Sequence, residues 1–123
     1  MSRVSYQEIR KRMNEKRSKI TDKKFFTSRL LSSYFEDLAM AQTRRYQYSR
    51  RIKVKIYWDE NDGHSASTNN RMILINAGHP IVTKVSGRAN RYQIVCGLFA
   101  HELALSWWNV LEYRVKVWLS CCR

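Results

Sequence analysis

The apolar residues of this chain switch from a helical period to a strand period near residue 50, and that switch constrains the fold more than any other sequence feature. Over residues 25–40 apolar side chains recur about every 3.6 residues, as on one face of an α-helix. Over residues 51–58 they alternate with basic or polar residues, as on a half-buried β-strand. The sequence therefore predicts an α+β fold.

The remaining elements follow from local signals. Ser5 and Glu8 have capping-box spacing and predict a short basic helix, and Thr21 or Asp22 can cap a long helix that ends near Tyr46. A polar loop over residues 59–70 precedes a short apolar strand at 72–75.

Beyond that strand, Pro80 and the nearby glycine argue against a helix. An apolar stripe predicts a last helix from about Ala89, and Gly97 within it suggests close packing against a neighbouring element.

We expect one domain of 123 residues, consisting of a basic helix or arm at 1–20, a folded part at 21–104 and an atypical tail at 105–123. The tail contains neither Gly nor Pro, and the alternation of Val115, Val117 and Leu119 hints at a strand. The three cysteines include an adjacent pair that is poorly placed to form a disulfide, and no stretch reads as a leader or a membrane span. These features favour a reduced, cytoplasmic protein with Cys96 as a small core residue.

Positive charge is concentrated in the first half of the chain. Residues 1–55 carry 16 Lys or Arg and 5 Asp or Glu, whereas residues 56–123 carry 7 and 5. Cations interleaved with Tyr46 and Tyr48 offer phosphate and base contacts, so one functional alternative is a basic nucleic-acid-binding or partner-binding module without catalysis. Its candidate residues are Arg44, Arg45, Arg50, Arg51, Lys53 and Lys55. A solvated basic strand face explains the same residues, so we expect only weak, sequence-independent binding.

The adjacent pair His101 and Glu102 provides the second functional hypothesis. In an HExxH helix, two histidines four residues apart converge on one zinc ion, and the glutamate takes a proton from the metal-bound water. Here Leu105 occupies the position of the second histidine, and leucine cannot ligate a metal. Taken alone, the pair also fits a surface histidine beside an ordinary helical glutamate.

The residues around this pair carry a family resemblance. Residues 90–103 (NRYQIVCGLFAHEL) resemble the active helix of zincin-type metallopeptidases, in particular the bacterial metallopeptidase domains associated with von Willebrand factor A-like domains. Residues 69–76 (NNRMILIN) resemble the sheet-edge strand of such folds. The resemblance covers about residues 21–103 and ends there.

The resemblance implies a zincin-like fold with a short mixed or antiparallel sheet, and a peptide or protein substrate. It implies that His101 is a zinc ligand, that Glu102 is the catalytic base, and that Ile73, Leu74 and Ile75 form the edge strand that pairs with an extended substrate. Because Leu105 breaks the motif, we expect zinc to be bound weakly or not at all, and we expect no efficient hydrolysis.

Two explanations fit the broken motif. The chain is a degenerate copy that kept the fold and lost the metal, or the residues after Leu103 belong to a shifted reading frame or a truncated end, with the back half of the fold missing. The abrupt change of composition favours the second explanation. His64 and His79 are expected to be loop residues, although either could join His101 in a rearranged site.

Overall fold

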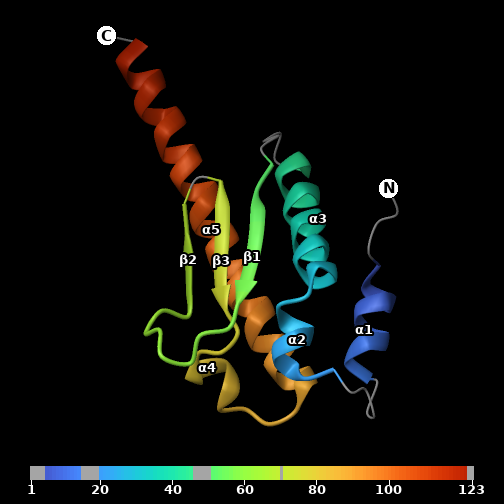
Figure 1. Cartoon of the computed structure of the whole chain (residues 1–123). Coiled ribbons are helices and arrows are strands. Elements are labelled where there is room, and N and C mark those ends of the chain that lie inside the picture. The colour runs from blue at the N-terminus through green and yellow to red at the C-terminus, as the bar shows by residue number, and fades with distance from the viewer. Residues whose placement is uncertain (1–4, 15–19, 46–50, 70, 122–123) are drawn as a thin grey trace.

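The computed structural model describes residues 5–14, 20–45, 51–69 and 71–121, with the backbone alone for 43–45 and 107–121. It is a mixed α+β fold in which a three-stranded sheet carries helices on one face (Figure 1). The strands are β1 (Lys53–Tyr57), β2 (Ala66–Thr68) and β3 (Met72–Asn76). The helices are α1 (Tyr6–Asn14), α2 (Asp22–Phe26), α3 (Arg29–Arg45), α4 (Pro80–Thr83) and α5 (Arg88–Cys121).

The sheet has the strand order β1-β3-β2, with β1 parallel and β2 antiparallel to β3. The mixed sheet was expected, but β2 was not, because its three residues lack an apolar alternation. The edge position expected for Ile73, Leu74 and Ile75 is wrong. These residues form the middle of β3, where Ile73 pairs with Val54 on one side and Thr68 on the other.

The hydrophobic core lies between one face of the sheet and the helices α3 and α5. Ile73 and Ile75 are fully buried, and the Phe35 ring of α3 stacks on Phe99 and Tyr92 of α5 at centroid distances of 4.6 and 6.2 Å. Cys96 is free and half-buried beside this core, as expected, and burial raises the pKa of its thiol. The strands predicted from the period of two and the helices predicted from the period of 3.6 thus pack together in one hydrophobic core.

The first helices begin where their capping signals predict. The Glu8 amide donates to Ser5 Oγ, and the Lys24 amide donates to Thr21 Oγ1. The single helix expected from Thr21 onward is, however, two helices. Thr27 ends α2 by donating its side-chain hydroxyl to the Lys23 carbonyl, and the Ser28 hydroxyl accepts from the Leu31 amide at the start of α3. Hydroxyl side chains that compete for backbone partners explain the break.

Two further expectations are wrong. A short helix, α4, begins at Pro80, because proline is well suited to the first helical position, where its missing amide donor is not needed. The tail does not form a strand at Val115, Val117 and Leu119, since α5 continues without interruption to Cys121 and projects past the sheet (Figure 1). After Gly97 the tail has no helix-breaking residue, so the backbone can remain helical through the expected boundary at 104.

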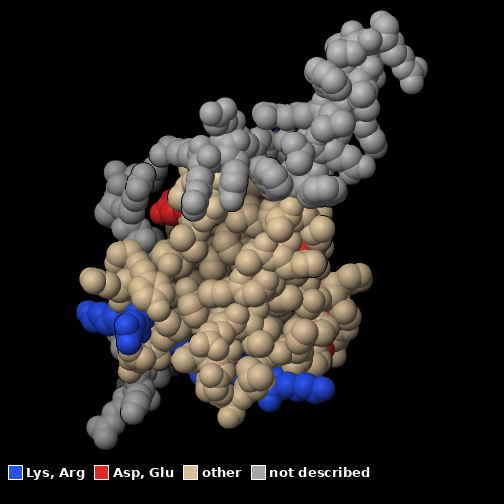
Figure 2. All heavy atoms as spheres, turned by 180° about the vertical axis from the view of Figure 1, so that it is seen from behind, with Lys and Arg blue, Asp and Glu red and all other residues tan. Residues whose placement is uncertain are grey.

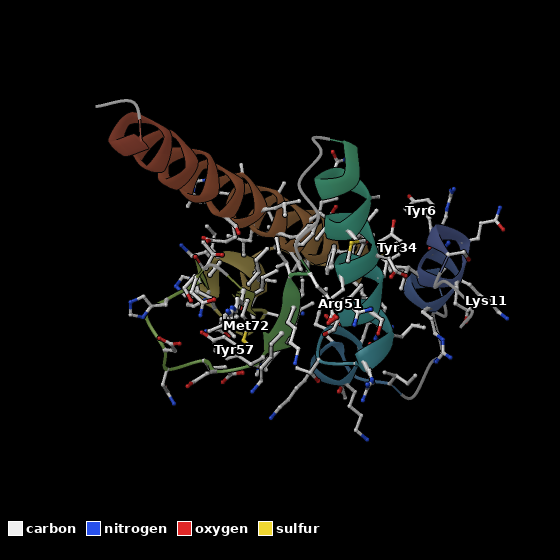
Figure 3. All side chains as sticks on the ribbon, turned by 90° about the horizontal axis from the view of Figure 1, so that it is seen from above. Tyr6, Lys11, Tyr34, Arg51, Tyr57 and Met72 are labelled. Carbon is white, nitrogen blue, oxygen red and sulfur yellow. The ribbon has the colours of Figure 1, made fainter. Side chains whose placement is uncertain are left out.

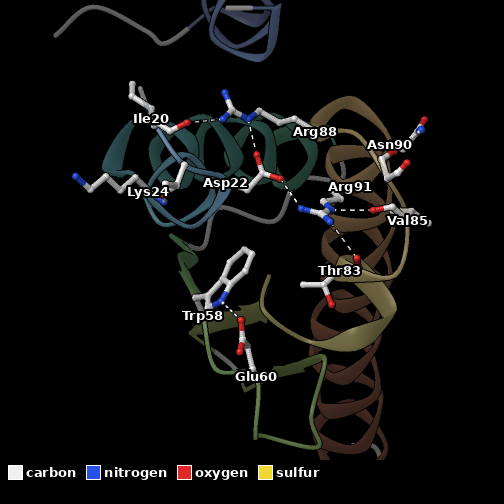
Figure 4. A network of polar contacts seen from close by, with 12 residues as sticks. Ile20, Asp22, Lys24, Trp58, Glu60, Thr83, Val85, Arg88, Asn90 and Arg91 are labelled. Carbon is white, nitrogen blue, oxygen red and sulfur yellow. Dashed lines mark hydrogen bonds and ion pairs between the residues drawn. The ribbon is translucent and has the colours of Figure 1, made fainter. Parts of the chain in front are cut away.

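Two arginines anchor the start of α5 to the start of α2 (Figure 4). Arg88 Nε and Arg91 Nη1 donate to the two carboxylate oxygens of Asp22 at 2.8 and 2.6 Å. Arg88 also donates to the Ile20 carbonyl and lies over the Phe25 ring. Burial by itself raises the pKa of Asp22, but the hydrogen bonds from the two guanidinium groups outweigh it and hold that pKa below 3.8.

A buried asparagine organises the loop at the carboxyl ends of β1 and β3. Asn76 is fully buried; its side-chain oxygen accepts from the Asp59 and Gly78 amides, and its side-chain nitrogen donates to the Asp59 and His64 carbonyls. Gly78 lies so close to Trp58 and Asp59 that an added Cβ would come within 2.9 Å of both. The loop is therefore fixed by one side chain and one close backbone approach.

We predict that Asp22→Asn lowers the free energy of unfolding by about 2–3 kcal/mol at neutral pH, because two partly buried guanidinium groups lose their counter-charge. The folded-state pKa of Asp22 lies below 3.8. The stabilisation that Asp22 provides is therefore complete above about pH 3.8, and it is lost as the pH falls through the lower pKa of the folded state. In urea titrations, the difference in free energy of unfolding between wild type and variant should become smaller at acidic pH. Exposed Asp37→Asn is the control, and an equal effect from it would contradict the assignment.

Gly78→Ala should cost about 1–3 kcal/mol, because the new methyl group meets the Asp59 backbone as well as the Trp58 ring. Gly63 lies in the same loop region, and no described atom lies within 4 Å of the position that a Cβ would take there. Gly63→Ala is therefore a matched control that should be nearly neutral. Thermal unfolding of both variants tests this. Similar melting temperatures for the two would show that the close approach at Gly78 is not rigid.

Candidate functional site

His101 and Glu102 lie on a helix, α5, as predicted. This helix contacts β3, and it also contacts the unexpected strand β2. The residues of α5 that turn inward recur at alternating spacings of three and four. They are Tyr92, Val95, Phe99, Glu102 and Ser106. This stripe directs Glu102 toward the rest of the fold and leaves His101, one residue away, exposed to solvent.

The outer face of α5 carries His101 together with Leu105, which is 40% exposed. Positions four residues apart share one helical face, so the two histidine positions of an HExxH motif point the same way here. The described outer face has no charged side chain from Gln93 to Leu105, and Figure 2 shows a largely uncharged surface from that side. The close packing expected at Gly97 is not found, because Gly97 is exposed and no described atom lies within 4 Å of a Cβ added there.

Two polar side chains on the inward stripe are buried. Glu102 is 7% exposed, and no described residue donates a hydrogen bond to its carboxylate. Ser106, one turn further, is fully buried, and its hydroxyl has no partner within the described residues. A buried hydroxyl without a partner is costly in a core, so Ser106 marks a place where the sequence departs from simple packing. Ser106 was missed in the sequence, although its spacing of four from Glu102 was the available signal.

The other two histidines lie in loops, as expected, and each has local partners. His64 Nδ1 is 3.1 Å from an Asp62 carboxylate oxygen. His79 accepts from the Ile81 amide through Nδ1, which caps α4, and its Nε2 is 3.2 Å from the Gly63 carbonyl oxygen. Within the described part of the chain, no three His, Cys, Asp or Glu residues gather in a way that could hold a metal ion. The described donors therefore do not form a three-ligand zinc site, and the described partners of both loop histidines lie in their own loops.

The basic candidates are only partly described. Arg51, Lys53 and Lys55 are exposed, and the two lysines belong to β1. The side chains of Arg44 and Arg45 and the whole of Arg50 lie outside the described residues. Only the strand portion of the predicted patch can therefore be placed.

Comparisons of this chain with protein-family models, with curated proteins and with solved structures gave no match. In the described part of the chain, no helix combines the length and the apolar character needed to cross a bilayer.

The burial of Glu102 predicts a gain in stability when its carboxylate is removed. Glu102→Leu should raise the free energy of unfolding by about 1–2 kcal/mol, because an apolar side chain suits the inward stripe better. His101→Leu, on the neighbouring exposed position, should change it by less than about 0.5 kcal/mol. Urea midpoints at neutral pH provide the measurement. A clear loss of stability in Glu102→Leu would mean that the carboxylate has a stabilising partner.

Proposed function

We propose that this chain is a zincin-like, metallopeptidase-type domain that is catalytically inactive. The observation that carries the proposal is the arrangement of α5, with a His-Glu pair on a helix that packs along a mixed sheet and with positions 101 and 105 on one accessible face. A histidine at both positions would give an HExxH zinc helix. With Leu105 in place, His101 has no second imidazole at the HExxH spacing.

The sheet supports the same proposal once its edge is reassigned from β3 to β2. On the side that faces β3, the Ser65 carbonyl accepts a hydrogen bond from the Asn76 amide, and the Asn69 amide donates to the Met72 carbonyl. Because strand residues alternate in direction, the backbone groups of Ala66 and Thr68 point away from β3, toward the free edge. β2 also contacts α5. An extended peptide added to β2 would therefore lie beside the helix that carries His101 and Glu102.

The proposed inactivity rests on ligand chemistry. A catalytic zinc site generally uses three protein ligands and keeps one position open for water. Leu105 offers no donor atom, and the other two histidines, His64 and His79, have partners in their own loops. Glu102 could act as a base only toward a bound water that some group activates, and the described residues supply no such group.

We expect purified protein to contain little zinc and to show no chelator-sensitive peptide hydrolysis. Leu105→His should raise zinc affinity measurably, because it completes two ligands one helical turn apart on an exposed face. Turnover should remain poor, since a third ligand is still lacking. Zinc content by metal analysis and zinc titration by calorimetry provide the two measurements.

The matched control is the double variant His101→Ala with Leu105→His, which should bind zinc no better than wild type. An equal gain in this variant would show that position 105 recruits another ligand and that His101 does not face it. Stoichiometric zinc in the unmodified protein, lost on His101→Ala, would overturn the proposal of an inactive site.

A further inference from the structure

The sheet has an outer face, opposite α3 and α5, whose side chains differ in character from those of the inner face. The inner positions of β1 and β3, such as Val54 and Ile73, are buried in the core. The strand register places the alternate residues on the outer face, with Lys53 beside Met72 and Lys55 beside Leu74. Figure 3 views the sheet from above, with Met72 and Tyr57 on the side of the strands away from α5.

The outer face combines a cationic row with an apolar strip. Lys53 and Lys55 are exposed and, as alternate residues of one strand, stand roughly 6.6 Å apart. Met72 and Leu74, on the next strand, are half-buried apolar side chains. Arg51, just before β1, adds a third exposed cation near the same end of the strand.

The acidic residues near this surface lie at its other end. Asp59, Glu60 and Asp62 follow β1, in the loop after its carboxyl end. Asp62 accepts a hydrogen bond from the Tyr57 hydroxyl at 2.7 Å, which fixes the half-buried tyrosine at the end of the lysine row. The cationic part of the face is therefore the amino-terminal part of β1, with the neighbouring part of β3.

We propose that this outer sheet face binds single-stranded nucleic acid, with Lys53 and Lys55 contacting successive phosphates and the strip of Met72 and Leu74 contacting unpaired bases. A row of lysines neutralises phosphates without reading sequence, so binding is electrostatic and falls steeply with salt. The partly exposed apolar side chains beside the row can make van der Waals contacts with bases that are not already stacked in a duplex. The inference stands on the sheet register and on exposure, and it is independent of the proposed role of His101.

The apolar strip, rather than the charge, favours nucleic acid over an acidic peptide. An acidic peptide would satisfy Lys53 and Lys55, but only a nucleic acid carries a ring at every repeat of its charged backbone to cover Met72 and Leu74. The charge-free outer surface of α5, on the opposite side of the molecule, offers no competing cationic site from Gln93 to Leu105 (Figure 2). The two faces thus differ in the kind of partner that they fit.

The test is fluorescence anisotropy of the full chain with a fluorescein-labelled oligothymidylate over a series of salt concentrations. The double variant Lys53→Gln with Lys55→Gln should weaken binding roughly tenfold at low salt, and it should reduce the slope of log affinity against log salt by about 1.4, for two lost phosphate contacts. Lys53→Arg with Lys55→Arg keeps the charge and should retain both affinity and slope. Urea midpoints establish that each variant folds.

The matched control removes two exposed charges from α1, by Arg10→Gln with Lys11→Gln, and should leave the slope unchanged. Figure 3 shows Lys11 on the far side of α3 from the sheet. An equal loss in both double variants would overturn the proposal in favour of diffuse attraction to a basic protein. Absence of measurable binding by the wild type would also overturn it, as would equally effective competition by polyglutamate or by duplex DNA at matched charge.

Discussion

The carboxylate of Asp22 accepts hydrogen bonds from both Arg88 and Arg91. Because both arginines lie in the first turn of α5, this ionic contact favours one rotation of the helix about its own axis. A helix turns by about 100° per residue, so an error of one residue would exchange the inner and outer faces around His101 and Glu102. The apolar stripe of Tyr92, Val95 and Phe99 favours the same rotation through burial. Because charge pairing and apolar packing agree, α5 has one well-defined orientation on the sheet.

That orientation decides the chemistry of the His-Glu pair. His101 faces outward with Leu105, while Glu102 is buried, one turn before the buried hydroxyl of Ser106. We expect the carboxyl-bearing and hydroxyl-bearing side chains in this otherwise apolar stripe to reduce stability, and selection for stability alone would not favour them there. These two side chains lie on α5, which contacts β2, the strand that we propose to pair with an extended peptide.

The sheet contributes to both proposals through different parts of its geometry. The free edge of β2 presents backbone groups, which pair with any extended chain and discriminate little by sequence. The outer face presents the side chains of β1 and β3, where lysines stand beside apolar residues. Since an edge and a face of one sheet are separate surfaces, each proposal can fail without the other.

The sequence by itself determined the elements whose signals are local. The capping residues Ser5 and Thr21, the alternation around Val54 and the stripe of α5 act over a few neighbouring residues, so they could be read without a fold. The α+β class and the helical placement of His101 and Glu102 followed from them. The presence of Leu105 where an HExxH motif has its second histidine is a property of the sequence alone.

Only the tertiary structure decided which strand lies at the edge of the sheet and which way each functional side chain points. The apolar run in β3 is compatible with a central or an edge strand, and the short polar β2 forms because β3 offers it backbone partners. Likewise, the break at Thr27 and the burial of Ser106 depend on neighbours that are distant in sequence or on competing hydrogen bonds. Pairing and burial are long-range properties, so the period of a sequence predicts which faces exist, whereas the packing of α5 and β2 against β3 decides what each face meets.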